Sequence, residues 1–233
     1  LENSTFLHQG NAEFLAKRPL LGRLLTVGAR WPREEQKAAL LFLLNVTHET
    51  ATGCRAACTG GGLTALVDLF LRLGGQTAGL GEDGAHEYEL VNLLLGLLIN
   101  VVEKDEDLRS DLAVLCRHEA AASPRGASAG DQSPAAPCTD GGGLLYLLCR
   151  LIFAGQRAAH KAKAEEEVTA DMVTTSEAKG ESTINRAYAS ILLGFIICDD
   201  AQMKDAVARI LPGESLDSLV EALEEFSQFL NSV

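Results

Sequence analysis

Hydrophobic and polar positions are segregated most sharply in the stretch 88–115 of this chain. Residues 93–99 read LLLGLLI, an apolar run that gives way to the acidic cluster 103–107. A helix that is apolar on every side must pack among other helices rather than face water. The run is too short to span a bilayer, and Asn92 and Asn100 bracket it. The pattern therefore predicts a central buried helix in an all-α domain.

The same apolar pattern occurs three times along the chain. Residues 39–45 read ALLFLLN and residues 94–100 read LLGLLIN, with the two asparagines in equivalent places. Residues 191–198 form a third copy, ILLGFIIC, which ends in cysteine instead. Polar residues follow each copy, namely His48 and Glu49, then the cluster 103–107, then Asp199 and Asp200.

A second element follows each apolar run. In the first two copies it begins with three glycines, at 60–62 and 141–143, and continues as an amphipathic helix. In the third copy LPGES at 211–215 takes the place of the glycines, and Ser215 is placed to cap the next helix. The apolar stripe of that helix comprises Leu216, Leu219, Val220, Leu223, Phe226 and Leu230, with Asp217, Glu221, Glu224 and Glu225 opposite. This predicts a terminal helix with one solvent-exposed face, as a capping repeat requires.

Each unit thus consists of a buried helix, a polar turn with a short helix, a glycine turn and an amphipathic helix. Such units predict a HEAT/armadillo-type helical repeat solenoid, an all-α fold. We expect residues 1–233 to form a single domain that is a piece of a longer protein. Residues 117–140 and 161–180 hold few large apolar side chains and are predicted to be disordered or flexible insertions. Before the first unit, residues 11–27 predict a helix that Pro19 interrupts.

Composition and charge argue against a nucleic-acid-binding protein and against a disulfide-bonded one. The 233 residues are 47% hydrophobic and only 5% aromatic, with a net charge of −12 and a pI near 4.9. This acidic balance does not suit direct nucleic-acid binding, which needs clustered Lys and Arg. The six cysteines do not resemble a disulfide framework, because Cys149 and Cys198 lie within apolar helical runs. They indicate a reducing compartment.

The chain carries no motif that predicts catalysis or cofactor binding. No phosphate-binding GxxxxGK[ST] sequence occurs. Cys54 and Cys58, with His48 nearby, lack the spacing and the second ligand pair of a zinc site. Cys116 and His118 could act as nucleophile and base only with a preorganised third group, so we expect them to be surface residues. We therefore expect no enzyme activity, no cofactor and no metal.

Several short apolar motifs occur in a fixed order, namely LLNVT at 43–47, GLLINVVE at 96–103, LLCRLIFAGQRAA at 147–159, AYASILLG at 187–194 and LPGE at 211–214. Together they resemble the C-terminal HEAT-repeat domain of the wings apart-like family, the cohesin-release factors. The resemblance covers roughly residues 36–233.

This resemblance implies a non-catalytic scaffold that binds cohesin and promotes its release from chromatin. The implied partners are the SMC ATPase head, the kleisin and the HEAT-repeat subunit of cohesin, together with a Pds-type accessory protein. It implies no direct contact with nucleic acid, a membrane or a small molecule. The implied location is the nucleus, on chromatin, with roles in the cell cycle, sister chromatid cohesion and chromosome segregation.

Candidate partner-binding residues are polar groups at the repeat edges, where solenoids bind partners. They are His48, Glu49, Glu103, Lys104, Asp105, Asn185, Tyr188, Asp199 and Asp200. Solvation or helix capping is the alternative role for each of them.

Two other functions fit an all-α chain. One is an armadillo-type adaptor that binds an extended peptide of another partner. Such adaptors use a ladder of Trp and Asn, whereas this chain has one tryptophan, Trp31, outside the repeats. The other is an enzyme that uses Cys116 or the 103–107 cluster. In that case a single substitution at Cys116 or within the cluster would abolish its activity.

Overall fold

The computed structural model describes residues 9–17, 20–77, 85–122, 143–153 and 174–232, and within these ranges it contains helices and turns but no strand. The all-α prediction is therefore confirmed, and the packing of the helices is consistent with a helical repeat fold. The helices are α2 (Gln9–Ala16), α3 (Leu21–Gly28), α4 (Arg33–Thr47), α5 (Ala51–Cys58), α6 (Gly62–Thr77), α7 (Ala85–Lys104), α8 (Glu106–Ala122), α10 (Thr174–Ile197), α11 (Ala201–Ile210) and α12 (Asp217–Ser232), with short 3₁₀ turns η1 (Thr59–Gly61) and η3 (Pro212–Glu214). A further apolar helix spans Leu144–Phe153.

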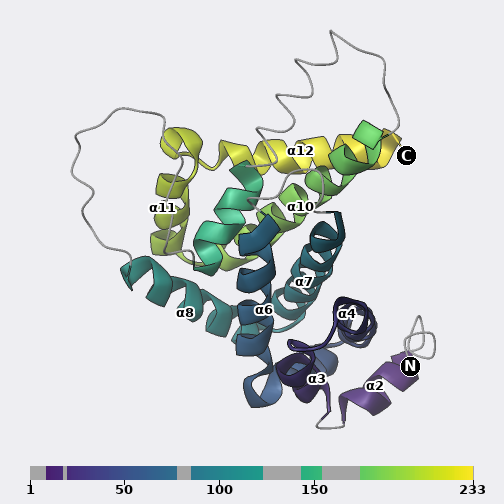
Figure 1. Ribbon diagram of the computed structural model, residues 1–233. Helices are drawn as coiled ribbons and strands as arrows, with labels where there is room; N and C mark the ends of the chain where they lie inside the picture. Colours follow the sequence, from purple (N-terminus) through teal and green to yellow (C-terminus); the bar gives the residue numbers. More distant parts are fainter. Residues whose placement is uncertain (1–8, 18–19, 78–84, 123–142, 154–173, 233) are drawn as a thin grey trace.

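Helices α4, α7 and α10 form the centre of the molecule, and α7 lies between the other two (Figure 1). Helix α7 also contacts α6 and α8. Its side chains Leu94, Leu95, Leu97 and Leu98 have no exposed area. An apolar stripe this wide requires neighbours on several sides, and α4, α6, α8 and α10 supply them. The predicted central helix is confirmed.

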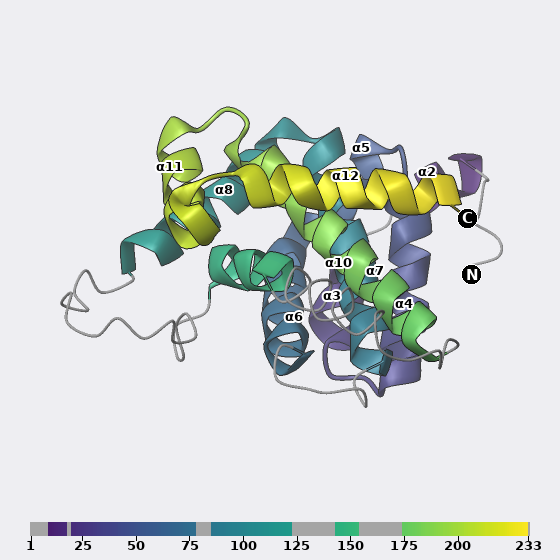
Figure 2. The same cartoon turned by 90° about the horizontal axis from the view of Figure 1, so that it is seen from above.

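The predicted repeating unit is also present. Each central helix ends at a polar turn, which leads into a short helix in the first and third units and into the longer α8 in the second. A third helix then packs back onto the centre, as α6 does on α7 and α12 does on α10 (Figure 2). Each unit buries its apolar face against its neighbour, which is the arrangement that defines a solenoid.

The glycine turn before α6 is required by backbone geometry. Gly60 and Gly61 have φ values of 64° and 86°, which side-chain-bearing residues rarely adopt. A Cβ atom on Gly62 would collide with the carbonyl oxygen of Ala57. Gly213 has φ 71° in the equivalent turn of the third unit. The glycines at 60–62 thus form a turn that lets α5 and α6 pack closely, whereas residues 141–142 of the second triplet lie outside the described residues.

The stretch Ala51–Gly75 is long and apolar enough to cross a membrane, judged by length and composition alone. In the structure it is two helices, α5 and α6, separated by the turn at Gly60 and Gly61. Half of its most apolar window is buried inside the molecule. The stretch therefore has the features of core helices in a helical repeat.

The two predicted insertions are shorter than expected. Residues 117–122 belong to α8 and residues 174–180 belong to α10, so these parts are helical rather than disordered. Alanine-rich and charged segments of this kind extend a helix at little cost. The remaining parts, 123–140 and 161–173, lie outside the described residues. At the N-terminus the predicted interruption is confirmed, because α2 ends at Ala16 and α3 begins at Leu21.

Two predictions about cysteines are wrong. Cys116 is fully buried rather than at the surface, because it lies on the side of α8 that faces the core, with Leu112. Cys198 is exposed rather than buried, because α10 ends one residue earlier, at Ile197. Cys54 is buried as a small apolar side chain, and burial raises the pKa of its thiol to about 12.

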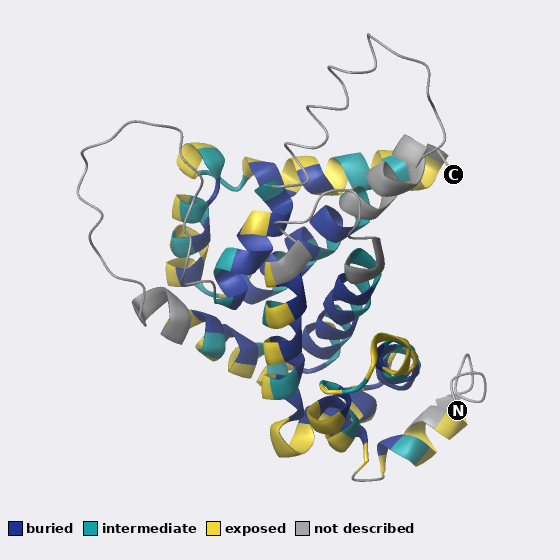
Figure 3. Ribbon diagram, in the orientation of Figure 1, coloured by how far each residue is buried: buried dark blue, intermediate teal, exposed yellow. Residues whose placement is uncertain are grey.

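The terminal helix α12 is covered less completely than predicted. Leu219 and Ala222 are buried, but Val220, Leu223 and Leu230 are 54%, 40% and 59% exposed. Figure 3 shows exposed residues along the outer side of this helix. The predicted apolar stripe is therefore wider than the surface of α10 that receives it.

Two acidic residues of α12 contact α10 although their side chains stay partly exposed, at 54% for Glu221 and 37% for Glu225. Arg186 of α10 is 2% exposed and pairs with Glu225, with Glu221 at 3.8 Å. A buried arginine needs carboxylate partners, so these two residues help to hold α12 on α10.

Candidate functional site

The candidate site is the edge of the molecule where each central helix ends and the next short helix begins. Thr50, Asp105 and Asp200 are the residues immediately before α5, α8 and α11. The first four N–H groups of a helix lack partners within the helix, so this position favours a side chain that accepts hydrogen bonds.

Asp105 is a buried cap rather than an exposed contact residue, contrary to the prediction of an exposed row. Only 3% of it is exposed. Its Oδ1 accepts hydrogen bonds from the amides of Asp107 (3.1 Å) and Leu108 (3.2 Å). Its Oδ2 accepts a hydrogen bond from the Nε of Arg55 in the preceding unit. A terminal nitrogen of the same guanidinium group donates to Oδ2 of Asp107 at 3.4 Å. Burial alone would raise the pKa of Asp105, but Arg55 and these amides hold it below its usual value.

Asp200 repeats this arrangement in the third unit. Its Oδ1 accepts from the amide of Met203 at 3.0 Å and so caps α11. Its Oδ2 accepts from Arg117 of α8 at 2.6 Å. The Met203 amide and then Arg117 lower the pKa of Asp200. In both cases an arginine of one unit holds the capping aspartate of the next.

The first unit uses a different arrangement. The hydroxyl of Thr50 donates to the carbonyl of Val46 at 2.6 Å and does not cap α5. His48 and Glu49 are exposed, as predicted, and Glu49 has φ 56°. A left-handed backbone at a residue other than glycine is uncommon and carries strain.

Asn100 joins the first unit to the second. Its Nδ2 donates to the carbonyl of Leu44 (3.4 Å) and to the hydroxyl of Thr47 (3.1 Å) on α4. The backbone carbonyl of Asn100 accepts a hydrogen bond from the thiol of Cys54 at 3.4 Å. The amide of Asn100 therefore has a structural role, since it links the ends of α4 and α7. The amide group is already committed, so it is unsuited to the peptide-binding ladder of an adaptor.

Charged side chains line the exposed part of this edge. Lys104 pairs with Glu103 at 2.9 Å, and this hydrogen bond raises the pKa of Lys104, with a smaller contribution from Glu49. In the next unit Asp199 lies 3.9 Å from Arg109. Its side chain is 88% exposed. Among the predicted contact residues, Glu49, Glu103 and Asp199 are therefore the carboxylates that the edge presents to solvent.

Arg109 connects the second and third units at the same edge. Its Nε donates to the carbonyl of Val102 at 2.9 Å, and its guanidinium lies over the ring of Phe195 at 5.6 Å. The Cys198 thiol lies 4.0 Å from one of its terminal nitrogens, and the carboxylate of Asp199 raises the pKa of this thiol, as does its partial burial.

Asn185 and Tyr188 do not belong to this edge. Both lie in the middle of α10, where Tyr188 packs edge-on against Phe226 of α12 with ring centroids 6.2 Å apart. Asn185 is only 3% exposed, and its amide atoms have no hydrogen-bond partner among the described residues. Tyr188 therefore packs between α10 and α12, and Asn185 is too buried to be a contact residue in this conformation.

Sequence reasoning missed the four arginines that organise these junctions, Arg55, Arg109, Arg117 and Arg186. No local signal set them apart, because Arg109 and Arg117 share α8 with His118, and Arg186 shares α10 with Lys179. The partner of each arginine lies in another helix, so spacing along the chain could not identify it.

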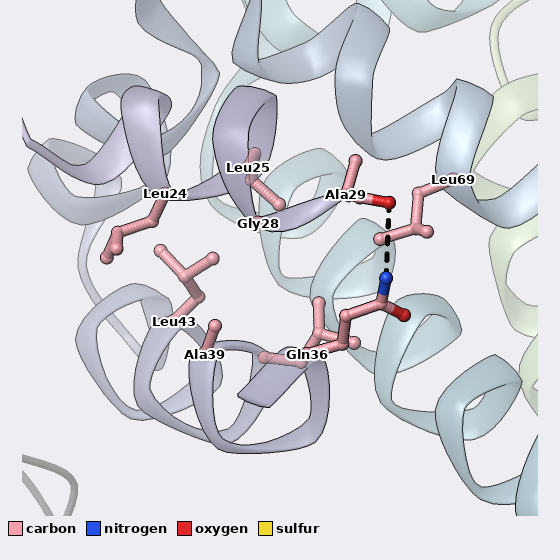
Figure 4. A pocket seen from close by; sticks show the side chains of 9 residues that line it. Leu24, Leu25, Gly28, Ala29, Gln36, Ala39, Leu43 and Leu69 are labelled. Atoms are coloured by element: carbon pink, nitrogen blue, oxygen red, sulfur yellow. Dashed lines mark hydrogen bonds between the residues drawn. The ribbon is translucent and has the colours of Figure 1, made fainter. Parts of the chain in front are cut away.

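The described residues offer no evident ligand chemistry. They contain no group of three or more His, Cys, Asp or Glu side chains that could hold a metal ion. A small apolar hollow lies among α3, α4 and α6 (Figure 4). Its polar side chain, Gln36, already donates to the carbonyl of Ala29 at 3.1 Å. The hollow thus lacks the converging polar groups that orient a ligand.

Comparison with curated proteins finds two relatives from Arabidopsis thaliana. Wings apart-like protein 2 is 26% identical over 209 residues, and Wings apart-like protein 1 is 26% identical over 211 residues. Each match covers 82% of this chain. The chain is thus similar to the wings apart-like proteins.

The matched region spans 24% and 21% of the lengths of these wings apart-like proteins, so this chain corresponds to about a quarter of each. No protein-family model matches the chain. The wings apart-like resemblance found in the apolar motifs is nevertheless confirmed by both alignments.

Proposed function

We propose that this chain is a non-catalytic scaffold that binds cohesin and its accessory subunits and promotes release of cohesin from chromatin. The observation that carries the proposal is the similarity to two wings apart-like proteins over 82% of the chain. The proposed partners are the SMC ATPase head, the kleisin, the HEAT-repeat subunit and a Pds-type accessory protein. The proposed site of action is chromatin in the nucleus.

The architecture supports a scaffold. Capping aspartates and arginines join consecutive units, so the edge is held as one surface. A rigid edge binds a partner without the entropy cost of ordering a flexible one. We place the contact on the exposed carboxylates Glu49, Glu103 and Asp199, which would pair with Lys or Arg of a partner.

The armadillo-type adaptor remains the alternative proposal. It requires free amide groups along the central helices. The amide of Asn100 is bonded to Leu44 and Thr47, which disfavours this role at that position.

The test is calorimetric titration of this chain against a reconstituted cohesin core with its accessory subunit. The variant Glu49→Lys/Asp199→Lys reverses two exposed charges and leaves the capping residues Asp105 and Asp200 intact. We expect the wild-type chain to bind and the variant to bind at least about tenfold more weakly, a loss of about 1.4 kcal/mol.

The matched control is Asp68→Lys, a charge reversal at an exposed position of α6 outside the edge. It should bind like the wild type, and circular dichroism should show equal helicity for all three chains. Equal binding by all three chains would mean that the chain binds cohesin, but through residues other than Glu49 and Asp199. Absence of binding by the wild type would contradict the proposal for this chain.

A further inference from the structure

Helix α12 carries an apolar strip that no described residue covers. Val220, Leu223 and Leu230 are 54%, 40% and 59% exposed and lie on one side of the helix at 3.6 residues per turn. Asp217 and Glu224, both exposed, run along one flank of this strip. The helix contains no Lys, Arg or His. Its outer face is therefore apolar with an acidic border.

The opposite end of the molecule has the complementary character. Leu20, just before α3, and Val27 within it are 57% and 52% exposed and lie on one side of the helix. Arg23 of α3 borders them on one flank, and Arg30 follows in the turn just after the helix ends; both are exposed. Helix α3 contains no Asp or Glu. Arg23 and Arg30 are seven residues apart, as are Asp217 and Glu224.

We propose that α12 of one molecule binds the α3 end of a second copy of this chain. Figure 1 places α3 and α12 at opposite ends of the molecule, so the two surfaces cannot meet within one chain. Antiparallel pairing of α12 with another α12 would oppose carboxylates with carboxylates, which is unfavourable, and parallel pairing would leave both rows of acids without a basic partner. Pairing of α12 with α3 buries apolar side chains on both sides and opposes acids with arginines.

Helical geometry selects one relative orientation. When each helix is viewed along its axis from the N-terminus, the charged residues lie beside the apolar strip in opposite rotational directions. The arginines are displaced against the direction in which the chain turns, and the acids of α12 are displaced along it. Two such helices placed face to face and parallel bring the acids beside the arginines. An antiparallel placement would put them on opposite sides of the contact.

The contact joins unlike surfaces, so it leaves one free surface at each end. Repetition of such a contact gives a ring or an open row of molecules rather than a closed symmetric dimer. The few side chains involved indicate a weak association, in the class of small interfaces. Because the charged groups are exposed, salt should weaken it.

Analytical ultracentrifugation of the chain, in reductant so that Cys198 cannot form intermolecular disulfides, tests this proposal. The wild-type average mass should rise with protein concentration and fall back toward the monomer in high salt. Arg23→Glu/Arg30→Glu should be monomeric because both ends are then acidic. Asp217→Lys/Glu224→Lys should be monomeric because both ends are then basic.

The decisive sample is an equimolar mixture of these two charge-reversed chains. Each end of one then complements an end of the other, so the mixture should associate although neither chain does alone. Leu223→Gln and Val27→Gln should each weaken wild-type association by about tenfold. These exposed positions keep the test available if a charge-reversed chain fails to fold.

Arg150→Glu and Asp111→Lys are the matched controls, because both residues are exposed and lie on other helices. They should associate like the wild type. A wild-type chain that stays monomeric at all concentrations, or a mixture that does not associate, would overturn the proposal. The inference is independent of cohesin binding, because it involves α3 and α12 and not the edge carboxylates.

Discussion

At the scale of single residues, the capping aspartates Asp105 and Asp200 are the most informative groups. Each accepts backbone amides of its own unit and an arginine of the preceding unit. Charge-assisted hydrogen bonds to a carboxylate are stronger than neutral ones. Both aspartates therefore stabilise the folded chain in their ionised form, which is why their pKa values are lowered.

The first prediction concerns the pH dependence of this stabilisation. A lowered folded-state pKa means that the stabilisation is present above the unfolded pKa of about 3.9 and is lost as pH falls through the folded value. Asp105→Asn should lower the free energy of unfolding by about 1–2 kcal/mol at neutral pH. The difference from the wild type should shrink below about pH 4. Urea unfolding followed by circular dichroism across this range measures it.

Asp107→Asn is the internal control, because Asp107 also contacts Arg55 but its side chain is 88% exposed. Exposed ion pairs contribute little, so this variant should stay within about 0.5 kcal/mol of the wild type. Equal losses for the two variants would show that capping and burial do not distinguish Asp105.

At the scale of helices, the glycine turn between α5 and α6 sets how closely the two helices approach. A Cβ atom on Gly62 would collide with the carbonyl of Ala57, a backbone atom that cannot move freely. A Cβ atom on Gly75, near the end of the same helix, would meet no atom within 4 Å. The two glycines therefore differ in packing while sharing a helix.

The second prediction uses that difference. Gly62→Ala should destabilise the chain by about 1–3 kcal/mol, because the added methyl group overpacks the turn. Gly75→Ala should be neutral or stabilise by up to about 1 kcal/mol, because alanine favours a helix and loses less entropy on folding. Thermal unfolding of both variants checks the two signs. A stabilised Gly62→Ala chain would contradict the close approach.

The sequence predicted these elements well, because their signals are local. The apolar run of α7, the helix interruption at Pro19 and the glycine turn at 60 and 61 each depend on residues that are close together in the sequence. The insertion boundaries were wrong, since helix propensity carried α8 to Ala122 and began α10 at Thr174. Low apolar content predicts exposure but does not by itself end a helix.

At the scale of the whole molecule, stability depends on contacts between successive units. Helix α7 contacts the first and third units through α4 and α10. In repeat architectures, neighbouring interfaces supply much of the stability, so a defect in the middle unit affects both sides.

The third prediction follows from the position of Leu98 in α7, which has no exposed area. Leu98→Ala should cost about 2–5 kcal/mol, through lost burial and the cavity left behind. Amide hydrogen exchange should then accelerate in α4 and α10 as well as in α7. Leu230→Ala, at a position that is 59% exposed, should leave exchange in α4 and α7 unchanged. Acceleration confined to α7 would mean that the units are not coupled.

The sequence by itself determined the all-α class, the repeating unit, the central helix and the resemblance to wings apart-like proteins. The first three follow from periodicity and turn residues, which act between positions close in the chain, whereas the resemblance rests on short apolar motifs that occur in a fixed order. Only the tertiary structure decided which polar groups are free. Asp105 and Asn185 looked like edge residues but are buried, and Val220 looked buried but is exposed. Exposure depends on which helix packs above a residue, and that helix comes from a distant part of the chain.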